Sequence, residues 1–379
     1  MPKLTMPTRR EFLSIAGASL ASAGVGGSLL GSGLAEPAWA ATTFGPVKEE
    51  DAVISFGHVG PVSDEGWTWT HHQGLLAVKA AFPKAKYIEV ESIPYSADAT
   101  RTFRQFVADK STIVFITSEY GDLLAEVTKR APEIAFLECN GHRVDDNVSW
   151  YYIQHWMPTY VIGVAAGLLS NSGKLGYVGS FPVPSVYCGA SAFQMGARSV
   201  NPKATTQVIL INSWFDPQAA HQAGTALIDG GADFLFGIMD ESAYLQVAEQ
   251  RKVWAAMDNS DMRRYGPDSY VSSVLFDWRK LYVSQVKARL DGTWKPRQEI
   301  LLPMGDGTDR DAWGAKVPEA VQKQADAVRD KMLKGWTPFV GEIKDTDGKV
   351  RVKAGETMGL MELYNWSWPV EGVTGLKAA

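Results

Sequence analysis

The chain has 379 residues, of which 45% are hydrophobic and 21% are charged, and its formal net charge is −5. This length is too great for one ordinary core, so we expect two domains and a targeting segment. The mildly acidic balance, without a Lys/Arg-rich stripe, gives no reason to expect a nucleic-acid partner.

The first 40 residues predict an export signal. Arg9-Arg10 is followed by Phe12-Leu13 and a weakly apolar run, which is typical of a twin-arginine signal. The run ends at Ala38–Ala40, an A-x-A cleavage pattern, so we expect cleavage after Ala40 and a mature protein in the periplasm. No cysteine lies near this site for lipid attachment. No later stretch reaches the about 18 apolar residues of a transmembrane helix, so no membrane anchor is expected.

Residues 52–80 predict a strand, a polar loop and a helix. The first six, AVISFG, are apolar and rich in β-branched and aromatic types, as in a buried parallel strand. The loop carries Asp64, Glu65, Trp67 and Trp69, and helical spacing begins at Trp69. Parallel sheets bind ligands at such strand exits, so the loop suits a flat, hydrogen-bonding molecule. The alternative is that the two indoles only cover the edge of the sheet.

Strands and helices then alternate at intervals of roughly 30 residues, which is typical of a right-handed βαβ array. In the first half we expect strands at 87–90, at 112–117, in IAFLECNG and around Trp150, and a helix capped near Ser96. From Pro158 the pattern restarts with a helix of small residues and a strand at 174–178, and Asp216 is expected to cap a helix that opens with Pro217. The pattern predicts an α/β protein with two doubly wound parallel-sheet lobes and a ligand cleft between them.

The tail from residue 296 onwards has a different pattern. Asp347-Gly348 lies between alternating residues and predicts a hairpin, and the remainder is expected to wrap a lobe. The two cysteines, Cys139 and Cys188, make neither a disulfide framework nor a metal-ligand spacing. We interpret them as two small buried residues, with a disulfide between them as the alternative.

Six stretches, in order, resemble the basic-membrane-protein family of type I periplasmic substrate-binding proteins, which includes purine-nucleoside receptors of ABC transporters. They include GPVSDEGWTWTHHQG, and the most specific are NSWFDP and GEIKDTDGKVRV. The resemblance implies two lobes joined by crossovers near 156–158, 275–278 and 296–301. The N-terminal lobe would then comprise 50–157 and 276–298, and the C-terminal lobe 158–275 and 299–379. It further implies a purine-like ligand in the cleft, an ABC transporter permease as partner, and a monomer.

In the first lobe, the strand-exit loops supply the candidate ligand-binding residues. Trp67 is expected to stack on a planar ring, a contact of about 1 to 3 kcal/mol by analogy with base stacking. The other candidates would accept hydrogen bonds from the ligand or hold the loop: Ser63, Asp64, Glu65, Glu138 and Asn140.

In the second lobe, Phe181 and Trp214 are candidates for the opposite face of the ring, with plain packing as the alternative. Asp240 is expected to accept a hydrogen bond from the ligand, and its alternative role is to cap the next helix. Where the family has an acidic pair, this chain has Asn259, whose amide both donates and accepts. That departure favours a base, an oxidised purine or a more distant compound over a nucleoside.

Motifs of enzymes are absent from the sequence: it has no G-x-S-x-G, no H-E-x-x-H and no P-loop. His71 and His72 are adjacent on a predicted helix and diverge by about 100°, so they cannot both face one metal. We therefore expect no catalytic activity, no cofactor and no metal. The alternatives are a periplasmic hydrolase of a nucleoside or amide, built on Asp64, Glu65 and a histidine, and a ligand sensor for a membrane receptor.

Overall fold

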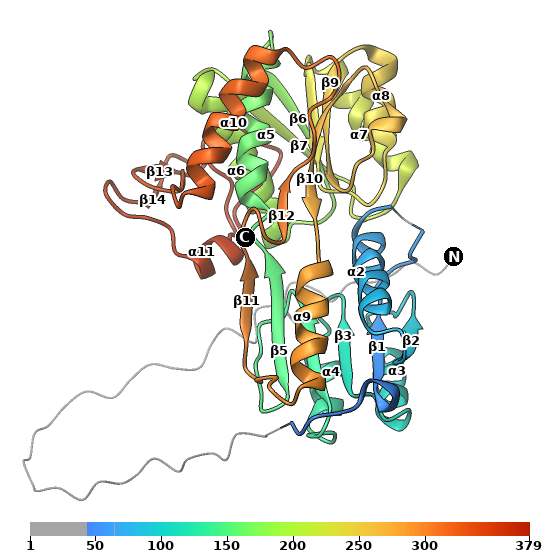
Figure 1. Ribbon diagram of the computed structural model, residues 1–379. Helices are drawn as coiled ribbons and strands as arrows, with labels where there is room; N and C mark the ends of the chain where they lie inside the picture. Colours follow the sequence, from blue (N-terminus) through green and yellow to red (C-terminus); the bar gives the residue numbers. More distant parts are fainter. Residues whose placement is uncertain (1–43, 64) are drawn as a thin grey trace, which may run out of the picture.

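The computed structural model describes residues 44–63 and 65–379 and has two parallel-sheet lobes, one above the other (Figure 1). The predicted export signal and Asp64 lie outside the described residues. The expected α/β class with two parallel sheets is confirmed. None of the helices in 44–63 and 65–379 is long and apolar enough to cross a membrane.

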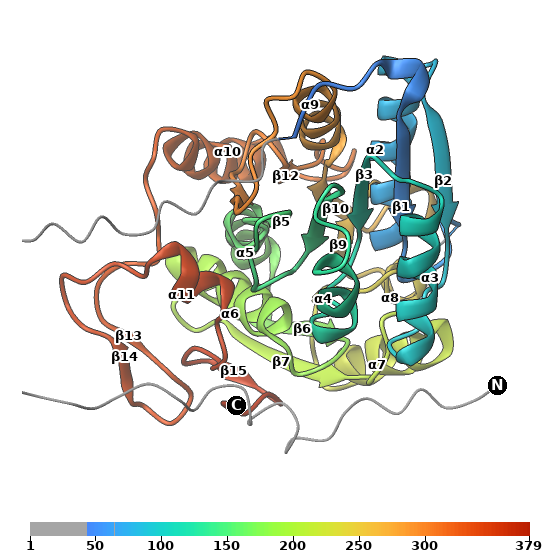
Figure 2. The same cartoon turned by 90° about the horizontal axis from the view of Figure 1, so that it is seen from below.

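The first lobe is built on a six-stranded, all-parallel sheet in the order β11-β5-β4-β3-β1-β2. Its strands are β1 Val53–Gly57, β2 Lys86–Val90, β3 Ile113–Ile116, β4 Ala135–Cys139, β5 Val148–Ile153 and β11 Glu299–Leu302. One face is covered by α2 Trp67–Ala81 and α9 Arg279–Leu290, and the other by α3 Ala97–Ala108 and α4 Asp122–Thr128 (Figure 2). Because helices cover both faces, β3, β4 and β5 are buried at every residue, which explains their continuous apolar runs.

The second lobe is built on a seven-stranded sheet in the order β12-β10-β9-β8-β6-β7-β15, in which only β12 is antiparallel. Its strands are β6 Lys174–Gly179, β7 Thr205–Leu210, β8 Phe234–Gly237, β9 Trp254–Asn259, β10 Tyr270–Phe276, β12 Thr308–Arg310 and β15 Val373–Thr374. Its helices are α5 Trp156–Leu169, α6 Pro184–Val200, α7 Pro217–Asp229, α8 Ala243–Arg251 and α10 Glu319–Leu333. The small residues expected to let α5 pack closely do so. A Cβ on Gly163 would lie 2.2 Å from the carbonyl oxygen of Phe193 on α6.

The chain passes between the two sheets after β5, after β10 and after β11. The expected position of the third passage, near 296–301 with 299 onwards in the second lobe, is wrong. Glu299–Leu302 instead form β11, which pairs in parallel with Trp150–Ile153 of β5, so the chain leaves the first sheet only after Leu302. Pairing with β11 satisfies the backbone groups of β5, which would otherwise be an open edge.

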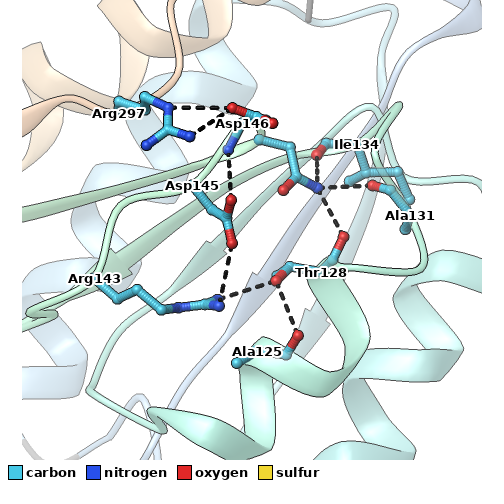
Figure 3. A network of polar contacts seen from close by, with 9 residues as sticks. Ala125, Thr128, Ala131, Ile134, Arg143, Asp145, Asp146 and Arg297 are labelled. Atoms are coloured by element: carbon cyan, nitrogen blue, oxygen red, sulfur yellow. Dashed lines mark hydrogen bonds and ion pairs between the residues drawn. The ribbon is translucent and has the colours of Figure 1, made fainter. Parts of the chain in front are cut away.

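The connection from β4 to β5 has no helix, although parallel strands usually need a crossover of about a dozen residues or more. A polar network holds this short connection in place (Figure 3). The Asn147 side-chain amide donates to the carbonyl oxygens of Thr128, Ala131 and Ile134 at 2.8–3.2 Å. Two ion pairs complete the network, Arg143 with Asp145 and Arg297 with Asp146. These contacts replace the packing that a crossover helix would provide.

Local signals in the sequence mostly agree with the structure. Ser96 accepts the backbone N–H of Asp98 at the start of α3, and Asp216 accepts that of Ala219 at the start of α7. Cys139 and Cys188 are both buried and free, as interpreted, and do not form a disulfide. The helix expected from Trp69 begins at Trp67, two residues earlier.

The tail contacts both lobes, where wrapping of one was expected. The hairpin is present as β13 Ile343–Lys344 and β14 Val350–Val352, with Gly348 at φ 79° in its turn. Tyr364, at the end of α11 Leu360–Tyr364, stacks on Trp150 of the first lobe with ring centroids 5.1 Å apart. Further on, β15 pairs with β7 at the edge of the second sheet. The tail therefore links the two lobes at a place other than the three passages.

Candidate functional site

The carboxyl ends of the parallel strands of both sheets face the space between the lobes (Figure 1). The loops that follow β1 and β3 come from one side, and those that follow β6, β8 and β9 come from the other. In open parallel sheets this is the edge at which ligands bind. Most of the candidate residues lie at these strand ends or in the loops that follow them.

Trp67 and Asp240 join the two lobes at this edge. The backbone N–H of Trp67, the first residue of α2, donates to Asp240 Oδ1 at 2.8 Å. The backbone N–H of Asp240 donates to the carbonyl oxygen of Trp214 at 3.0 Å. Asp240 does not cap the next helix, since Glu241 accepts the N–H of Ala243 at the start of α8. The carboxylate of Asp240 instead lies at the positive N-terminal end of a helix in the opposite lobe.

The half-buried indole of Trp67 lies in an aromatic group formed by both lobes and the passages between them. Its Nε1–H donates to the carbonyl oxygen of Thr117, which follows β3, at 2.7 Å. The rings around it are those of His71, Tyr152, Phe276 and Trp278. All four are perpendicular or tilted to the indole, with interplanar angles of 40–88°. None of the described rings stacks in parallel on Trp67.

Asn259 lies beside Asp240 at the end of β9. Its Nδ2 donates to Asp240 Oδ1 and to the carbonyl oxygen of Met239, both at 3.2 Å. Its Oδ1 is buried without a hydrogen-bond partner among the described residues. Because both amide protons are used within the protein, the side chain of Asn259 can only accept a hydrogen bond from a ligand, through Oδ1.

Five more buried polar atoms near the strand ends have no hydrogen-bond partner in the described part of the chain. They are His58 Nδ1, Thr117 Oγ1, Asn140 Oδ1, Ser180 Oγ and Asp258 Oδ2. Leaving a buried polar atom unpaired costs about 1–3 kcal/mol, so such a group indicates a ligand or bound water. Thr117 and Ser180 were not among the sequence candidates. The signal that points to them is their position, because each directly follows a strand, β3 or β6.

The Asp258 carboxyl is fully buried on β9, next to Asn259. Burial raises its pKa well above the ordinary value, and the nearby charge of Asp240 acts in the same direction. The raised pKa favours the protonated form, which can donate a hydrogen bond. Asp258 was not among the sequence candidates.

Backbone conformation distinguishes three of the candidate residues. Glu65, Asn140 and Asn259 have φ values of 61°, 59° and 69°, in the left-handed region that non-glycine residues seldom adopt. Asparagine tolerates this region better than glutamate does. Such residues cluster at ligand sites because the surrounding structure must hold them there.

The other candidates are less directly connected to the Trp67–Asp240 contact. Glu138 is buried and its Oε1 accepts the N–H groups of Tyr120 and Gly121 before α4, at 2.7 and 3.1 Å. Burial raises the pKa of Glu138 to about 7. The hydrogen bonds that Glu138 makes in the described structure therefore lie within the first lobe.

Phe181 and Trp214, from the second lobe, contact each other, with ring centroids 5.9 Å apart and an interplanar angle of 58°.

Glu65 and Ser63 lie further out, at the mouth between the lobes. Glu65 forms an ion pair with Arg264 of the second lobe and accepts from the Tyr265 hydroxyl at 2.8 Å. The Ser260 hydroxyl donates to the carbonyl oxygen of Glu65 at 2.5 Å. These contacts hold the loop after β1 against the second lobe.

The histidines of α2 have different surroundings, as their adjacency predicts. His71 is buried, stacks on Trp278 at 4.5 Å and hydrogen-bonds the Tyr282 hydroxyl at 2.5 Å. His72 hydrogen-bonds Glu89 at 2.6 Å on the outer side. No group of three or more His, Cys, Asp or Glu side chains in 44–63 and 65–379 is arranged to hold a metal ion.

Two such lobes, with polar strand ends facing each other across the gap, make up the type I periplasmic-binding-protein fold. Residues 52–335 match the family model described as "ABC transporter substrate-binding protein PnrA-like". The chain therefore belongs to the Bmp family of ABC transporter substrate-binding proteins, as its sequence motifs indicated. Proteins of this class bind small ligands and deliver them to permeases.

Two relatives show how the family varies. The chain is 36% identical to a protein from Brucella abortus named as purine-binding, over 86% of this chain and 93% of the relative. It is 30% identical to a putative ABC transporter glucose-binding protein from Haloferax volcanii, over 76% of this chain and 74% of the relative.

Solved structures agree on the fold. A solute-binding protein of an ABC transporter from Conexibacter woesei matches with a TM-score of 0.62 at 20% identity, covering 75% of this chain and 97% of that one. A transcriptional activator of the comK gene from Bacillus halodurans matches with a TM-score of 0.65 at 18% identity, covering 76% of this chain and 99% of that one. At such identities the likeness concerns the fold alone.

Proposed function

We propose that this protein is the periplasmic solute-binding component of an ABC importer and that it binds a purine-like heterocycle, a base or a close relative, between its lobes. The observation that carries the proposal is the indole of Trp67. It lies at the meeting edge of the two sheets, is fixed by Thr117, and has no described ring stacked on its face. A planar ligand placed there gains about 1–3 kcal/mol by stacking.

The unpaired polar atoms suit the edge of a purine. Asn140 and Asn259 offer amide oxygens as acceptors, and the raised pKa of Asp258 favours its protonated form, which can donate. A purine edge alternates N–H donors with ring-nitrogen acceptors, so it can pair with the amide oxygens and with the carboxyl donor at once. The purine-binding name of the Brucella relative supports this ligand class.

A sugar is the second candidate ligand, favoured by the glucose-binding name of the Haloferax relative. Sugar hydroxyls would also pair with these atoms. The higher identity and coverage of the Brucella relative favour the purine. We keep the sugar as an outcome of the test.

Binding is coupled to closure of the lobes. A ligand that contacts Trp67 from one lobe and the β9 end from the other is bound fully only when the lobes are closed. Its binding energy therefore shifts the population toward the closed form, which is the form a permease recognises. We expect the protein to act as a monomer without a membrane anchor.

The test is calorimetric titration of the purified protein with adenine, hypoxanthine, xanthine, adenosine and glucose, with native mass spectrometry for any ligand retained from the cell. Tight stoichiometric binding of a base supports the proposal. Preferred binding of glucose, or of adenosine over every base, overturns the ligand class. Product formation in the same mixtures, followed by chromatography, supports the hydrolase alternative. Import of the bound base by cells that express the protein with its permease separates transport from sensing.

A further inference from the structure

A cavity of about 570 Å³ lies at the mouth between the lobes. The first lobe contributes Ser63 and Glu65, and the second contributes Phe215, His221, Glu241 and Tyr265 among others. Trp67, Asp240 and Asn259 do not line it. This mouth cavity is therefore distinct from the site proposed for the purine.

Glu241 gives the mouth cavity an unused hydrogen-bonding group. Only 5% of the residue is exposed. Glu241 Oε2 accepts the backbone N–H of Ala243, whereas Oε1 is buried without a partner in the described residues. A buried carboxylate oxygen without a partner is stabilised when a ligand donates a hydrogen bond to it.

The two helices that begin at the mouth cavity do not make it an anion site. The first turn of α7 is capped by Asp216, which accepts the N–H of Ala219 at 2.9 Å. The first turn of α8 is capped by Glu241. Since a carboxylate of the protein already lies at each of these two helix starts, its negative charge disfavours a bound anion there.

Phe215 supplies an aromatic surface in the same cavity as this acid. It is 56% exposed, the highest value among the large hydrophobic residues of the described chain. An exposed aromatic ring near a buried carboxylate is the combination that binds organic cations in proteins. Arg264, the nearby cation, is already paired with Glu65 and lies over the Tyr265 ring.

We propose that the mouth cavity is an accessory site for a small organic cation, an ammonium or guanidinium compound, whose N–H groups donate to Glu241 and whose body lies on Phe215. Ser63 and Glu65 of the first lobe line the same cavity, so a cation that fills it from Glu241 and Phe215 to the Glu65 side contacts both lobes. It therefore favours the closed arrangement and strengthens binding at the inner site.

The pH dependence of cation binding follows from the ionisation of Glu241. Burial raises the pKa of Glu241 to about 7, and the charge of Asp216 adds to the effect. The other titratable or charged groups around Glu241 are His221, Tyr244, Tyr265, and Glu65 with its partner Arg264. As the pH rises from about 6 to 8 the Glu241 carboxyl ionises, so binding of a cation tightens.

The experiment is titration of the protein with benzylammonium chloride, and with benzyl alcohol as the neutral control, followed by ligand-observed NMR or calorimetry at about pH 6 and pH 8. We expect benzylammonium to bind, more tightly at the higher pH, and benzyl alcohol to bind at least about tenfold more weakly. Glu241→Gln and Phe215→Ala should each weaken binding about five- to tenfold. Asp229→Asn, at the far end of α7, is the matched control and should change nothing.

Equal binding of the alcohol, no binding of benzylammonium, or an unchanged affinity in both variants overturns the proposal. Phe215→Ala changes an exposed side chain and does not depend on the cap of α8, so a folding defect in Glu241→Gln leaves the test intact. Titration with the purine at the inner site is a separate readout. A cation site without purine binding, or the reverse, identifies which of the two proposals has failed.

Discussion

The backbone of Asp240 lies directly against Gly66 across the gap between the lobes. A Cβ added to Gly66 would lie 2.5 Å from Asp240 Cα and 2.6 Å from its Oδ1. The next residue, Trp67, donates its backbone N–H to that same oxygen. This close approach of the two lobes therefore depends on the missing side chain of Gly66.

Gly66→Ala should keep the lobes apart. The added methyl group would meet Cα of Asp240, a backbone atom that cannot move away as the end of a flexible side chain can. We expect ligand affinity to fall by about tenfold or more, because the open form loses contacts from one lobe. Small-angle scattering with saturating ligand should show a larger radius than the wild type. Gly45→Ala, where a Cβ would meet nothing within 4 Å, is the control, and an equal loss of affinity there would contradict this explanation.

Trp67→Ala should weaken binding of the ligand by at least about tenfold while the fold persists. The indole is half-buried and contacts other rings only by edges, so its removal leaves α2 anchored by its backbone. Trp67→Phe should recover part of the affinity, since a smaller aromatic face remains. Calorimetry measures both, and Trp336→Ala, on an exposed indole outside the site, serves as control. An unchanged affinity in Trp67→Ala would show that this ring does not touch the ligand.

Much of the fold could be predicted because its strands are buried on both faces. β4, Ala135–Cys139, is buried at each position, and that burial produces the apolar run which the sequence displays. The pairing of β11 could not be predicted in the same way. Glu299–Leu302 lie at the edge and are only partly buried, and their partner is chosen by backbone hydrogen bonds to a strand about 150 residues earlier.

Residues of the candidate site could be proposed from the sequence, but the contacts between them could not. Trp67 and Asp240 are conspicuous types at strand exits, but the bond between them uses a backbone N–H, which every non-proline residue has. Thr117 and Ser180 were missed because a hydroxyl after a strand is common. What distinguishes them is the lack of a partner for a buried oxygen, a property of the tertiary structure.

Asp240→Asn separates the charge of this residue from its shape. The amide oxygen can still accept the N–H of Trp67, so the contact between the lobes should survive. Loss of the negative charge should lower the pKa of Asp258, since Asp240 contributes to raising it. We expect the affinity for a purine base to fall by about tenfold and to become more sensitive to pH. Titrations between about pH 5 and pH 8 measure this. An unaffected titration would leave Asp240 only its role in joining the lobes.

Glu138→Gln should make the stability of the protein less dependent on pH. Burial raises the pKa of Glu138 to about 7 from an ordinary value of 4.5. The folded state therefore binds this proton more tightly than the unfolded state does. The resulting stabilisation is complete below about pH 4.5 and is lost as the pH rises through about 7, a change of about 3 kcal/mol.

In Glu138→Gln the amide oxygen can still accept the N–H groups of Tyr120 and Gly121, so the start of α4 keeps its cap. The variant has no carboxyl to ionise, and its stability should therefore decline less between about pH 5 and pH 8. Chemical unfolding at a series of pH values measures the free energy of unfolding directly. Burial also raises the pKa of Glu241 to about 7, so its ionisation lowers the stability of the folded protein over the same pH range. Adding Glu241→Gln to the Glu138→Gln variant should therefore reduce further the dependence of the free energy of unfolding on pH. A variant whose stability follows the wild-type pH curve would show that Glu138 is ionised in the folded protein at neutral pH, and its hydrogen bonds would then outweigh its burial.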